Sequence, residues 1–480
     1  MTTGINFKTK FLTERALQSA SRGQAASISA LETAYESDRG RILNSVAIRR
    51  LQQKTQVFPL ERNAAVRSRL THSMEVMQVG RYITRKVFSS LSDNQKKQFG
   101  LDGLERVFET VVEMACLLHD VGNPPYGHFG EDTIVNWFKR HIDQLTELSG
   151  NSLDQHQRQD LISFEGNAQA IRIVHSLQAL NLSYTQIASI LKYTRCAAEP
   201  KPIDNYLKKK PGYYLSEKGI VSDVLNALNI EAGCRHPVAY IMEAADDIAY
   251  CIADLEDAVE KGIMSTETLS TRLVERYQEI AKDFGISDEK DIGKLADIVA
   301  RASKKAADNH VVSNSEYFVS LRVSSQHIMV QHAATRFITH IEACYHGSFN
   351  ASLLEDKSPA HAISASFKAV AFDYAFSHHE VEQSELQGYQ IISGLLDKYG
   401  QLLALTESEF SSLFSKKCKF PLEKRLLKKL ADKHVNAYKL AVANEPQSEF
   451  YFRCRMVQDN ISGMTDHFAY DDYRTLFVCE

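Results

Sequence analysis

A histidine followed directly by an aspartate, with a second histidine and a glutamate close behind, is the group in this chain best suited to chemistry. His119 and Asp120 end an apolar run, and His128 and Glu131 follow a turn rich in glycine and proline. Imidazole nitrogens and carboxylate oxygens together suit a divalent ion such as Mg²⁺, Mn²⁺, Fe²⁺ or Co²⁺. One His–Asp pair also arises by chance in a chain of 480 residues, so the metal interpretation depends on the other segments.

Acidic residues in a second apolar segment are the next candidates. On a helix, residues four apart drift by only roughly 40° around the axis, so Asp246, Tyr250 and Asp254 are predicted to form one ridge among apolar side chains. Carboxylates in that setting need a metal or a Lys or Arg partner, and a salt-bridged structural helix is the alternative. Upstream, Arg69 and His72 share a predicted helix face, where a histidine is more often structural than a ligand.

These segments together offer the ligands of one octahedral ion. Two imidazoles and two carboxylates leave positions open for water and a phosphate oxygen. The candidate metal ligands are His72, His119, Asp120 and Asp246.

His128 and Glu131 form a candidate proton-relay pair, because a carboxylate fixes the tautomer of a histidine and raises its basicity. Arg50, Arg69 and Lys210 are candidate cations for a polyphosphate. No P-loop and no dinucleotide-binding glycine pattern competes for the phosphates. The residue types therefore indicate metal-assisted phosphoester hydrolysis.

Composition places these residues in an ordinary globular protein. The chain is 44% hydrophobic and 24% charged, with a net charge of −4 at pH 7, so no overall basic character indicates nucleic acid or an anionic membrane. Its eight cysteines include no Cys-x-x-Cys pair, which fits a reducing cytosol. There is no apolar signal segment, and no run approaches the roughly 20 apolar residues of a membrane span. We expect a cytoplasmic protein without a membrane partner.

The elements that must position the candidates are predicted to be helices throughout. We expect an all-α fold with an arm over residues 1–35, a catalytic core over 36–265 and a helical C-terminal region over 266–480. Residues 143–160 and 194–220 are expected to be inserted loops. The Lys208–Lys210 run in the second loop is either solvated or a phosphate grip. The predicted helices are 42–53, 67–88, 104–118, 128–138, 164–177, 242–257, 269–284, 326–345, 387–399, 422–443 and 451–464.

The order His72, His119–Asp120, Asp246 resembles the HD-domain phosphohydrolases, and longer motifs resemble the bacterial deoxyguanosinetriphosphate triphosphohydrolase family more closely. The resemblance covers most of the chain. The motifs are RRLQQKTQVFPL (49–60), RLTHS (69–73), HDVGNPPYGHFGE (119–131), FEGNAQ (164–169), KKPGYY (209–214), DDIAY (246–250), ELQGY (385–389) and DNISGMT (459–465).

That resemblance implies an HD-domain helical core elaborated by C-terminal helices, which converts dGTP and water to deoxyguanosine and tripolyphosphate. It implies Mg²⁺ or Mn²⁺ at the α-phosphate, held by the four metal candidates. His128, oriented by Glu131, would serve in-line attack or proton transfer at the ester oxygen. It also implies a homo-oligomer (a ring of dimers, tetrameric or hexameric) and, in some members, single-stranded DNA as an effector.

The resemblance also suggests residues that hold the substrate. Gln56 and Asp254 match positions that bind the sugar 3′-hydroxyl, and Tyr250 would exclude a 2′-hydroxyl. Guanine is expected to be read by Glu385, which can accept from N1–H and N2–H₂, and by Arg425 at O6. The expected phosphate contacts are Arg50, Arg69, Lys210 and Tyr214.

Two rival interpretations remain open. Another HD-type enzyme, such as a broad dNTP triphosphohydrolase or a nucleoside-monophosphatase, would share the metal site and differ at the base pocket. A nucleotide- or DNA-binding regulator with a silent site is the other rival, but such a protein needs no complete ligand and relay set. The sequence departs from the family pattern over residues 143–160 and 194–206, and Tyr126 stands where phenylalanine is common.

Overall fold

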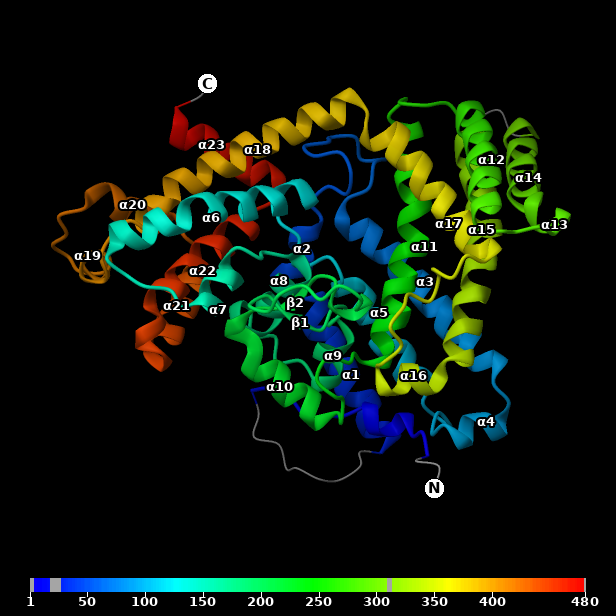
Figure 1. The fold of residues 1–480 in the computed structure, drawn as a ribbon, viewed down its shortest axis with the longest axis horizontal. Helices are drawn as coiled ribbons and strands as arrows, with labels where there is room; N and C mark the ends of the chain where they lie inside the picture. Colours follow the sequence, from blue (N-terminus) through cyan, green and yellow to red (C-terminus); the bar gives the residue numbers. More distant parts are fainter. Residues whose placement is uncertain (1–3, 18–26, 309–312, 479–480) are drawn as a thin grey trace.

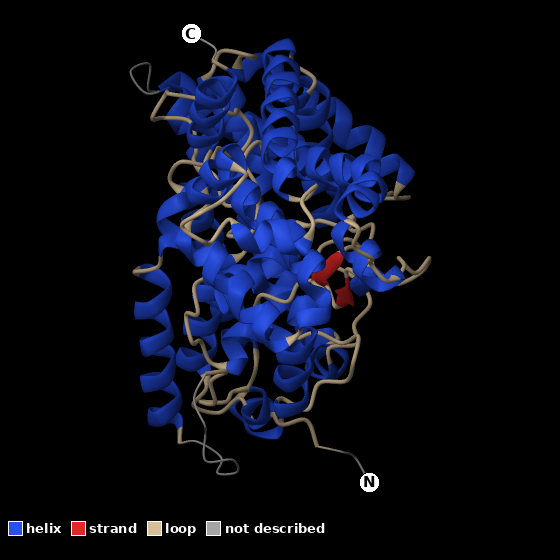
Figure 2. Ribbon diagram, turned by 90° about the vertical axis from the view of Figure 1, so that its left-hand side faces the viewer, coloured by secondary structure: helices blue, strands red, loops and turns tan. Residues whose placement is uncertain are grey.

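Helices make up nearly all of the regular structure in the computed structural model, which describes residues 4–17, 27–308 and 313–478. A single short parallel pair, β1 (Arg195–Cys196) with β2 (Pro211–Tyr213), is the only sheet in these ranges, and Figure 2 shows it as a small red patch among blue helices. The predicted all-α class is confirmed. None of the helices in the described ranges is both long and apolar enough to cross a bilayer.

The helices follow the chain in the order drawn in Figure 1. The first half contains η1 (Phe7–Lys10), α1 (Ile28–Leu43), α2 (Val46–Leu51), α3 (Arg69–Ser90), α4 (Asp93–Gln98), α5 (Glu105–Leu118), α6 (Gly127–Ser149), α7 (Gln155–Leu161), α8 (Gly166–Arg172), η2 (Ile173–Leu177), α9 (Tyr184–Ser189), η3 (Tyr206–Lys208), η4 (Leu215–Glu217), α10 (Lys218–Ala227) and α11 (Pro237–Glu260). The second half contains α12 (Thr266–Asp283), α13 (Glu289–Ile292), α14 (Lys294–Asp308), α15 (Ser313–Thr339), α16 (Ile341–His346), α17 (Pro359–Val370), η5 (Ala371–Phe376), α18 (His379–Tyr399), η6 (Gly400–Leu402), α19 (Glu407–Ser412), α20 (Pro421–Lys429), α21 (Asp432–Asn444), η7 (Pro446–Ser448), α22 (Glu449–Ser462) and α23 (Asp466–Phe477).

Two large hydrophobic cores organise these helices. The first is built around α3, α5, α11 and α15, which pack against one another. Helix α5 is apolar on nearly all sides, which is why it lies in the middle of that core. The second core joins α6, α18 and α22, on the left of Figure 1. Side chains from both cores line the same cavity, so the site lies where the two cores meet.

A glycine sets how closely α3 and α5 approach. A Cβ added at Gly80 would lie 2.6 Å from Cys116 Sγ and 2.9 Å from Val112 Cγ1. Both distances are shorter than a carbon side chain tolerates, so α5 must move away if Gly80 acquires a side chain. The spacing matters because α3 and α5 carry two of the candidate metal ligands.

Gly80→Ala is therefore expected to lower the free energy of unfolding by about 1–3 kcal/mol, the usual cost of overpacking a core. Gly40→Ala is the matched control. Gly40 lies on the exposed side of α1 with nothing near its missing Cβ, so alanine there should raise stability by about 0.5–1 kcal/mol. Urea unfolding followed by circular dichroism measures both, and an equal gain in the two variants would contradict the argument.

The N-terminal arm differs in part from the expectation of a loosely ordered segment. Phe7 and Phe11 are buried against the first core, and α1 already begins at Ile28, capped by the Ser27 side chain. The large aromatic area explains this packing. Residues 1–3 and 18–26 of the arm lie outside the described residues. The predicted helix over 42–53 is also divided, because Ser45 caps a new helix, α2.

Residues 143–160 are helical over much of their length, where a surface loop was expected. Helix α6 continues to Ser149, and α7 begins at Gln155. Asp160 is fully buried and forms an ion pair with Arg455, and it accepts a hydrogen bond from Tyr451 at 2.7 Å. A buried carboxylate is retained only with such partners. Residues 194–220 match the loop expectation better, since they hold only β1, β2 and short 3₁₀ turns before α10.

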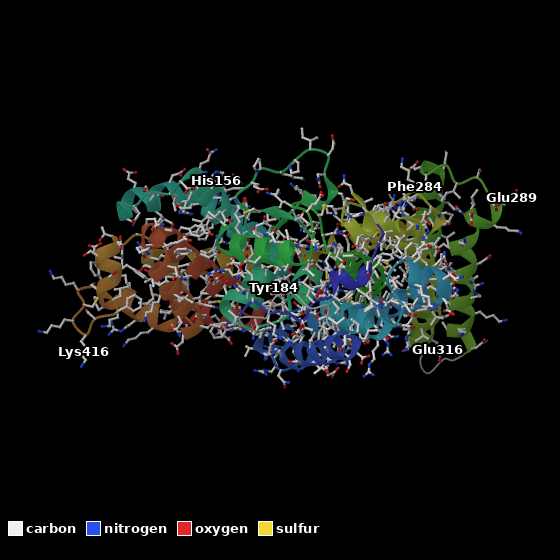
Figure 3. The ribbon with its side chains drawn as sticks, turned by 90° about the horizontal axis from the view of Figure 1, so that it is seen from below. His156, Tyr184, Phe284, Glu289, Glu316 and Lys416 are labelled. Carbon is white, nitrogen blue, oxygen red and sulfur yellow. The ribbon has the colours of Figure 1, made fainter. Side chains whose placement is uncertain are left out.

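The basic residues between α19 and α20 belong to the outer surface. Figure 3 shows Lys416 at one end of the molecule, with its side chain pointing outward, and residues 415–417 are exposed. These lysines therefore belong to a solvated face. The predicted domain boundaries at residues 35 and 265 stay a prediction.

Candidate active site

Three helices of the first core bring two histidines and one aspartate together. His72 lies on α3, His119 directly follows α5, and Asp246 lies on α11. One ligand atom from each of the three lies within 4.8 Å of the others. Asp246 Oδ1 is 3.5 Å from His72 Nε2 and 3.4 Å from His119 Nε2. These distances leave a position between the atoms where one ion can sit.

Asp120, the fourth predicted ligand, lies next to this cluster and is held in place from two sides. Its Oδ1 lies 3.5 Å from His119 Nε2 and accepts a hydrogen bond from Asn123 Nδ2 at 2.6 Å. Its Oδ2 accepts from Arg69 Nη1, also at 2.6 Å. The buried Arg69 guanidinium therefore orients the carboxylate. Burial favours protonation of Asp120, but the charges of His119 and Arg69 outweigh it and lower its pKa to about 2.

The state of His119 shows that the donor set fits a cation. Its Nδ1–H donates to the Cys116 carbonyl at 2.7 Å, which leaves the lone pair on Nε2. Nε2 is buried and has no hydrogen-bond partner among the described residues. Burial favours the neutral ring, yet Asp120 and Asp246 raise the pKa of His119 to about 9. The two carboxylates thus draw a positive charge to this point, and a metal ion can take the place of that proton.

His128 and Glu131 form a second, separate pair at the start of α6. His128 Nδ1–H donates to Glu131 Oε2 at 2.7 Å, and Glu131 Oε1 accepts from the Gly166 backbone N–H at 2.7 Å. Glu131 is buried, whereas the His128 ring is 79% exposed and lines the cavity. The buried carboxylate therefore fixes the ring and leaves Nε2 available to the cavity.

Glu131→Gln is expected to lower the pKa of His128 toward its ordinary value. The hydrogen bond and charge of Glu131 raise the pKa of His128 in the folded protein, so the stabilisation they give is present below the unfolded pKa and is lost as pH rises through the raised value. NMR titration of isotope-labelled histidine rings measures the shift, with Asp132→Asn on the exposed side of α6 as the control. An unchanged His128 titration in Glu131→Gln would mean that the pair is not formed in solution.

Both groups face one cavity of about 580 Å³, which residues of the two cores line. Helix α11 contributes Asp246 and Tyr250, and α18 contributes Glu385 from the opposite side. Cations also reach it, among them Arg69, Lys192 and Lys210. A cavity of this size and charge suits a polyanionic small molecule.

Comparison with known proteins identifies the family. The HD-domain family model matches residues 69–187. The chain is 49% identical to a protein of Pseudomonas aeruginosa named probable deoxyguanosinetriphosphate triphosphohydrolase, over 98% of this chain and 99% of that protein. It is 48% identical to the deoxyguanosinetriphosphate triphosphohydrolase of Yersinia pestis, over 99% and 100% of the two chains. The corresponding protein of Serratia proteamaculans is 49% identical over 93% and 94%. The chain belongs to the deoxyguanosinetriphosphate triphosphohydrolase family. The HD-domain match implies dependence on a divalent metal ion, in agreement with the His72, His119 and Asp246 geometry.

Several substrate contacts that the family resemblance suggested do face the cavity. Gln56 and Tyr250 line it, and Gln56 Oε1 is buried without a hydrogen-bond partner among the described residues. The Tyr250 ring stacks on Phe376, with ring centroids 6.3 Å apart. Asp254, one turn further along α11, is not among the residues that line the cavity: it is fully buried, and neither of its carboxylate oxygens has a hydrogen-bond partner in the described chain. Burial and Asp257 raise the pKa of Asp254 well above its ordinary value.

Three other predicted contacts are not brought to the cavity of this family member. Tyr214 is buried, and its hydroxyl donates to the Glu165 carbonyl at 3.1 Å. Arg425 is exposed on α20 and donates to the Pro421 carbonyl at 3.1 Å. Arg50 lies on α2, with its guanidinium beside Gly463. Thr55 and Lys210, which are near Arg50 and Tyr214 in the sequence, do line the cavity, but the side chains of Arg50 and Tyr214 point elsewhere.

The sequence interpretation missed other residues that the structure places in the cavity. Lys192 donates to Asp246 Oδ2 at 3.2 Å, and Lys368 donates to Asp247 Oδ1 at 2.8 Å. Asn123, Asn167 and Tyr193 also line it. Asn123 and Asn167 fall inside motifs that were recognised, so their polarity was an available signal. Lys192 follows the short helix α9 and Lys368 lies within α17, and the pattern of neither segment marks a site.

Proposed function

We propose that this protein hydrolyses dGTP to deoxyguanosine and inorganic tripolyphosphate. The observation that supports the proposal most directly is that His119 and Asp246 of the candidate metal cluster line the same cavity as His128, which Glu131 holds. The names of its close relatives in Pseudomonas and Yersinia support the same activity. A silent regulatory site is disfavoured, since such a site has no use for both groups.

His72, His119, Asp120 and Asp246 would hold the metal ion, which we propose to be Mg²⁺ or Mn²⁺. When bound, such an ion polarises a phosphoryl oxygen and orients water. Arg69, Lys192 and Lys210 line the same cavity and would neutralise the phosphates. Lys210 is also paired with Glu165, its Nζ 3.1 Å from Oε1, which limits where its charge can reach.

His128 would move the proton that the reaction requires at the leaving oxygen. Water oxygen bonds to the α-phosphorus, the bond from that phosphorus to O5′ breaks, and O5′ must gain a proton to leave as a hydroxyl. The raised pKa of His128 favours the imidazolium that can donate it from Nε2. Glu131 holds the ring by Nδ1 and stabilises its charge.

Residues in and next to the cavity wall are the proposed sugar and base contacts. Gln56 and Asp254 would bind the 3′-hydroxyl, and the Tyr250 ring would pack against C2′. Glu385 on α18 lines the same cavity and would accept from guanine N1–H and N2–H₂. Arg425 lies outside the cavity of its own chain, so a role at guanine O6 requires a second copy to present it.

Product analysis tests this function. With Mg²⁺ or Mn²⁺, dGTP is expected to yield deoxyguanosine and tripolyphosphate, and GTP is expected to react about 10- to 100-fold more slowly in kcat/KM, the range over which a packed surface rejects one extra hydroxyl. Ion chromatography with each dNTP and GTP measures both. Release of single phosphates would contradict the proposal, and equal rates for all four dNTPs would favour the broad triphosphohydrolase.

We also propose that the protein is cytoplasmic and assembles as a ring of dimers, tetrameric or hexameric, with single-stranded DNA as an effector. The family resemblance is the support for these partners. Light scattering of the purified protein measures the assembly, and dGTP hydrolysis with and without an oligonucleotide measures the effect of DNA.

A further inference from the structure

A second group of cations lies outside the cavity, where α2, α21 and the end of α22 meet. It consists of Arg50, Lys433 and His434 around Gly463, and we call it the basic cluster. None of these residues lines the 580 Å³ cavity. Lys54 lies between the basic cluster and the cavity. Its Nζ donates to the carbonyl of Asn123, which lines the cavity, at 2.5 Å, and to the carbonyl of Ser462, which precedes Gly463, at 3.0 Å.

Arg50 and His434 of the basic cluster meet beside Gly463. A Cβ added at Gly463 would lie 2.8 Å from the Asp459 carbonyl oxygen, 3.1 Å from Arg50 Nη1 and 3.4 Å from His434 Cε1. The Cε1 atom sits between the two ring nitrogens, so the polar edge of the imidazole and the end of the guanidinium both point to the space beside Gly463. Glycine at residue 463 lets both groups come this close, because a side chain there would collide with the Asp459 carbonyl oxygen.

The cluster lacks the anions that would normally balance it. His434 is 2% exposed, and neither ring nitrogen has a hydrogen-bond partner among the described residues. Arg50 and Lys433 are half-buried and form no ion pair within the described ranges. The nearest acid is Asp459, which already accepts from Arg172 Nη2 at 2.7 Å and from Gln169 Nε2 at 3.0 Å. Buried polar groups without partners are costly, so these indicate a missing ligand.

The start of α21 adds to the positive potential. This helix of 13 residues begins at Asp432, and its N-cap is Ala431, whose side chain cannot accept a hydrogen bond from the free backbone N–H groups. A helix N-terminus of this kind favours an anion. The carboxylate of Asp432, the first residue of α21, is exposed to solvent. It therefore neutralises only part of the positive potential at this helix N-terminus.

The protonation of the cluster agrees with this geometry. Burial, together with the charge of Arg50, lowers the pKa of Lys433 to about 8. Burial is also the main cause that lowers the pKa of His434 to about 4. An anion in the space between them would relieve the repulsion among the cations and offer an acceptor to the imidazole N–H.

We propose that the basic cluster is a binding site for a phosphate-type oxyanion, either free phosphate or the phosphate group of a nucleic acid. The partly exposed Arg50 and Lys433 form the entrance, and His434 with the N-terminus of α21 forms the closed end. This site is separate from the catalytic cavity, and its existence does not depend on the proposed hydrolysis of dGTP.

The test uses the full-length protein with isotope-labelled histidine rings, with His434 as the reporter for the cluster and His128 as the reporter for the cavity. Inorganic phosphate is titrated against sodium chloride of equal ionic strength, and an oligothymidylate without terminal phosphates is titrated separately. Arg50→Gln and Lys433→Gln remove the cluster cations. Arg49→Gln, exposed on the same helix, is the matched control.

Phosphate is expected to shift the His434 resonance in the wild type and in Arg49→Gln. The apparent Kd at His434 should rise about tenfold or more in Arg50→Gln and in Lys433→Gln, the effect of losing one charge-assisted hydrogen bond. The His128 response should stay unchanged in both, which separates this site from the cavity. A response to oligothymidylate alone would assign the anion to a nucleic-acid backbone and also support the site.

A His434 resonance that ignores both probes would overturn the proposal, as would equal affinities in the wild type and both cluster variants. If Arg50→Gln does not fold, Lys433→Gln decides alone, because Lys433 is partly exposed on α21 and has no ion pair in the described chain. The His434→Asn variant assigns the resonance.

Discussion

Replacing Asp120 by alanine is expected to lower kcat/KM for dGTP by about a thousandfold or more and to weaken Mn²⁺ binding by about 100-fold. A bound metal contributes several kcal/mol to the transition state, and each 1.36 kcal/mol is a factor of ten in rate. Asp120 lies next to His119 Nε2 and forms an ion pair with the buried Arg69. Its loss leaves the ion one ligand short and Arg69 unpaired.

Titration calorimetry with Mn²⁺ and a steady-state assay measure the two effects. Asp120→Asn keeps the shape of the side chain and separates the loss of the ligand charge from any loss of fold, which thermal unfolding monitors. Asp132→Ala, exposed on α6, is the control and should behave as the wild type. Unchanged Mn²⁺ affinity in both Asp120 variants would remove this residue from the metal site.

Replacing His128 by alanine is expected to lower kcat by about 10²–10⁴-fold, the range that a positioned general acid or base supplies. Mn²⁺ affinity should not change, since His128 is not part of the His72, His119 and Asp246 cluster. KM should change little, because the lost interaction is made mainly in the transition state. The ring is exposed in the cavity, so its removal should not disturb the packing.

The decisive comparison for His128 is with a histidine away from the site. His156 is exposed on α7 and is labelled in Figure 3 on the outer surface, so His156→Ala should keep full activity. The kcat of Glu131→Gln should lie between those of His128→Ala and His156→Ala, because this variant keeps the imidazole and loses only the carboxylate that orients it. Wild-type kcat in His128→Ala, or a loss of Mn²⁺ binding in that variant, would refute the separate roles of the two groups.

Local pattern was sufficient to predict the helices that carry the metal candidates. The apolar run before His119 is α5, buried on nearly all sides. The ridge of Asp246, Tyr250 and Asp254 does lie on one helix, α11. Ligand type and helical period are properties of neighbouring residues, which explains why the candidate metal cluster was found before any fold was known.

Contacts between residues that are distant along the chain could not be predicted from local sequence pattern. Asp160 lies in a polar stretch with the pattern of a loop, and its burial depends on Tyr451 and Arg455, which come 291 and 295 residues later. Arg50 and Tyr214 have the residue types of phosphate contacts, but Arg50 turns to Gly463 and Tyr214 to the Glu165 carbonyl. Lys192 reaches Asp246 from a segment whose pattern marks no site. In each case the direction of the side chain depends on tertiary packing.

The contacts of Lys54 with Ser462, and of Thr55 and Tyr126 with Asp466, have a consequence for the newly made chain. The wall of the cavity depends on residues that leave the ribosome about 400 positions after the segments they hold. A nascent chain can already contain every candidate metal ligand and the whole HD domain, yet it lacks these contacts. We therefore expect nucleotide hydrolysis to begin only after residues 462–466 have been synthesised and docked.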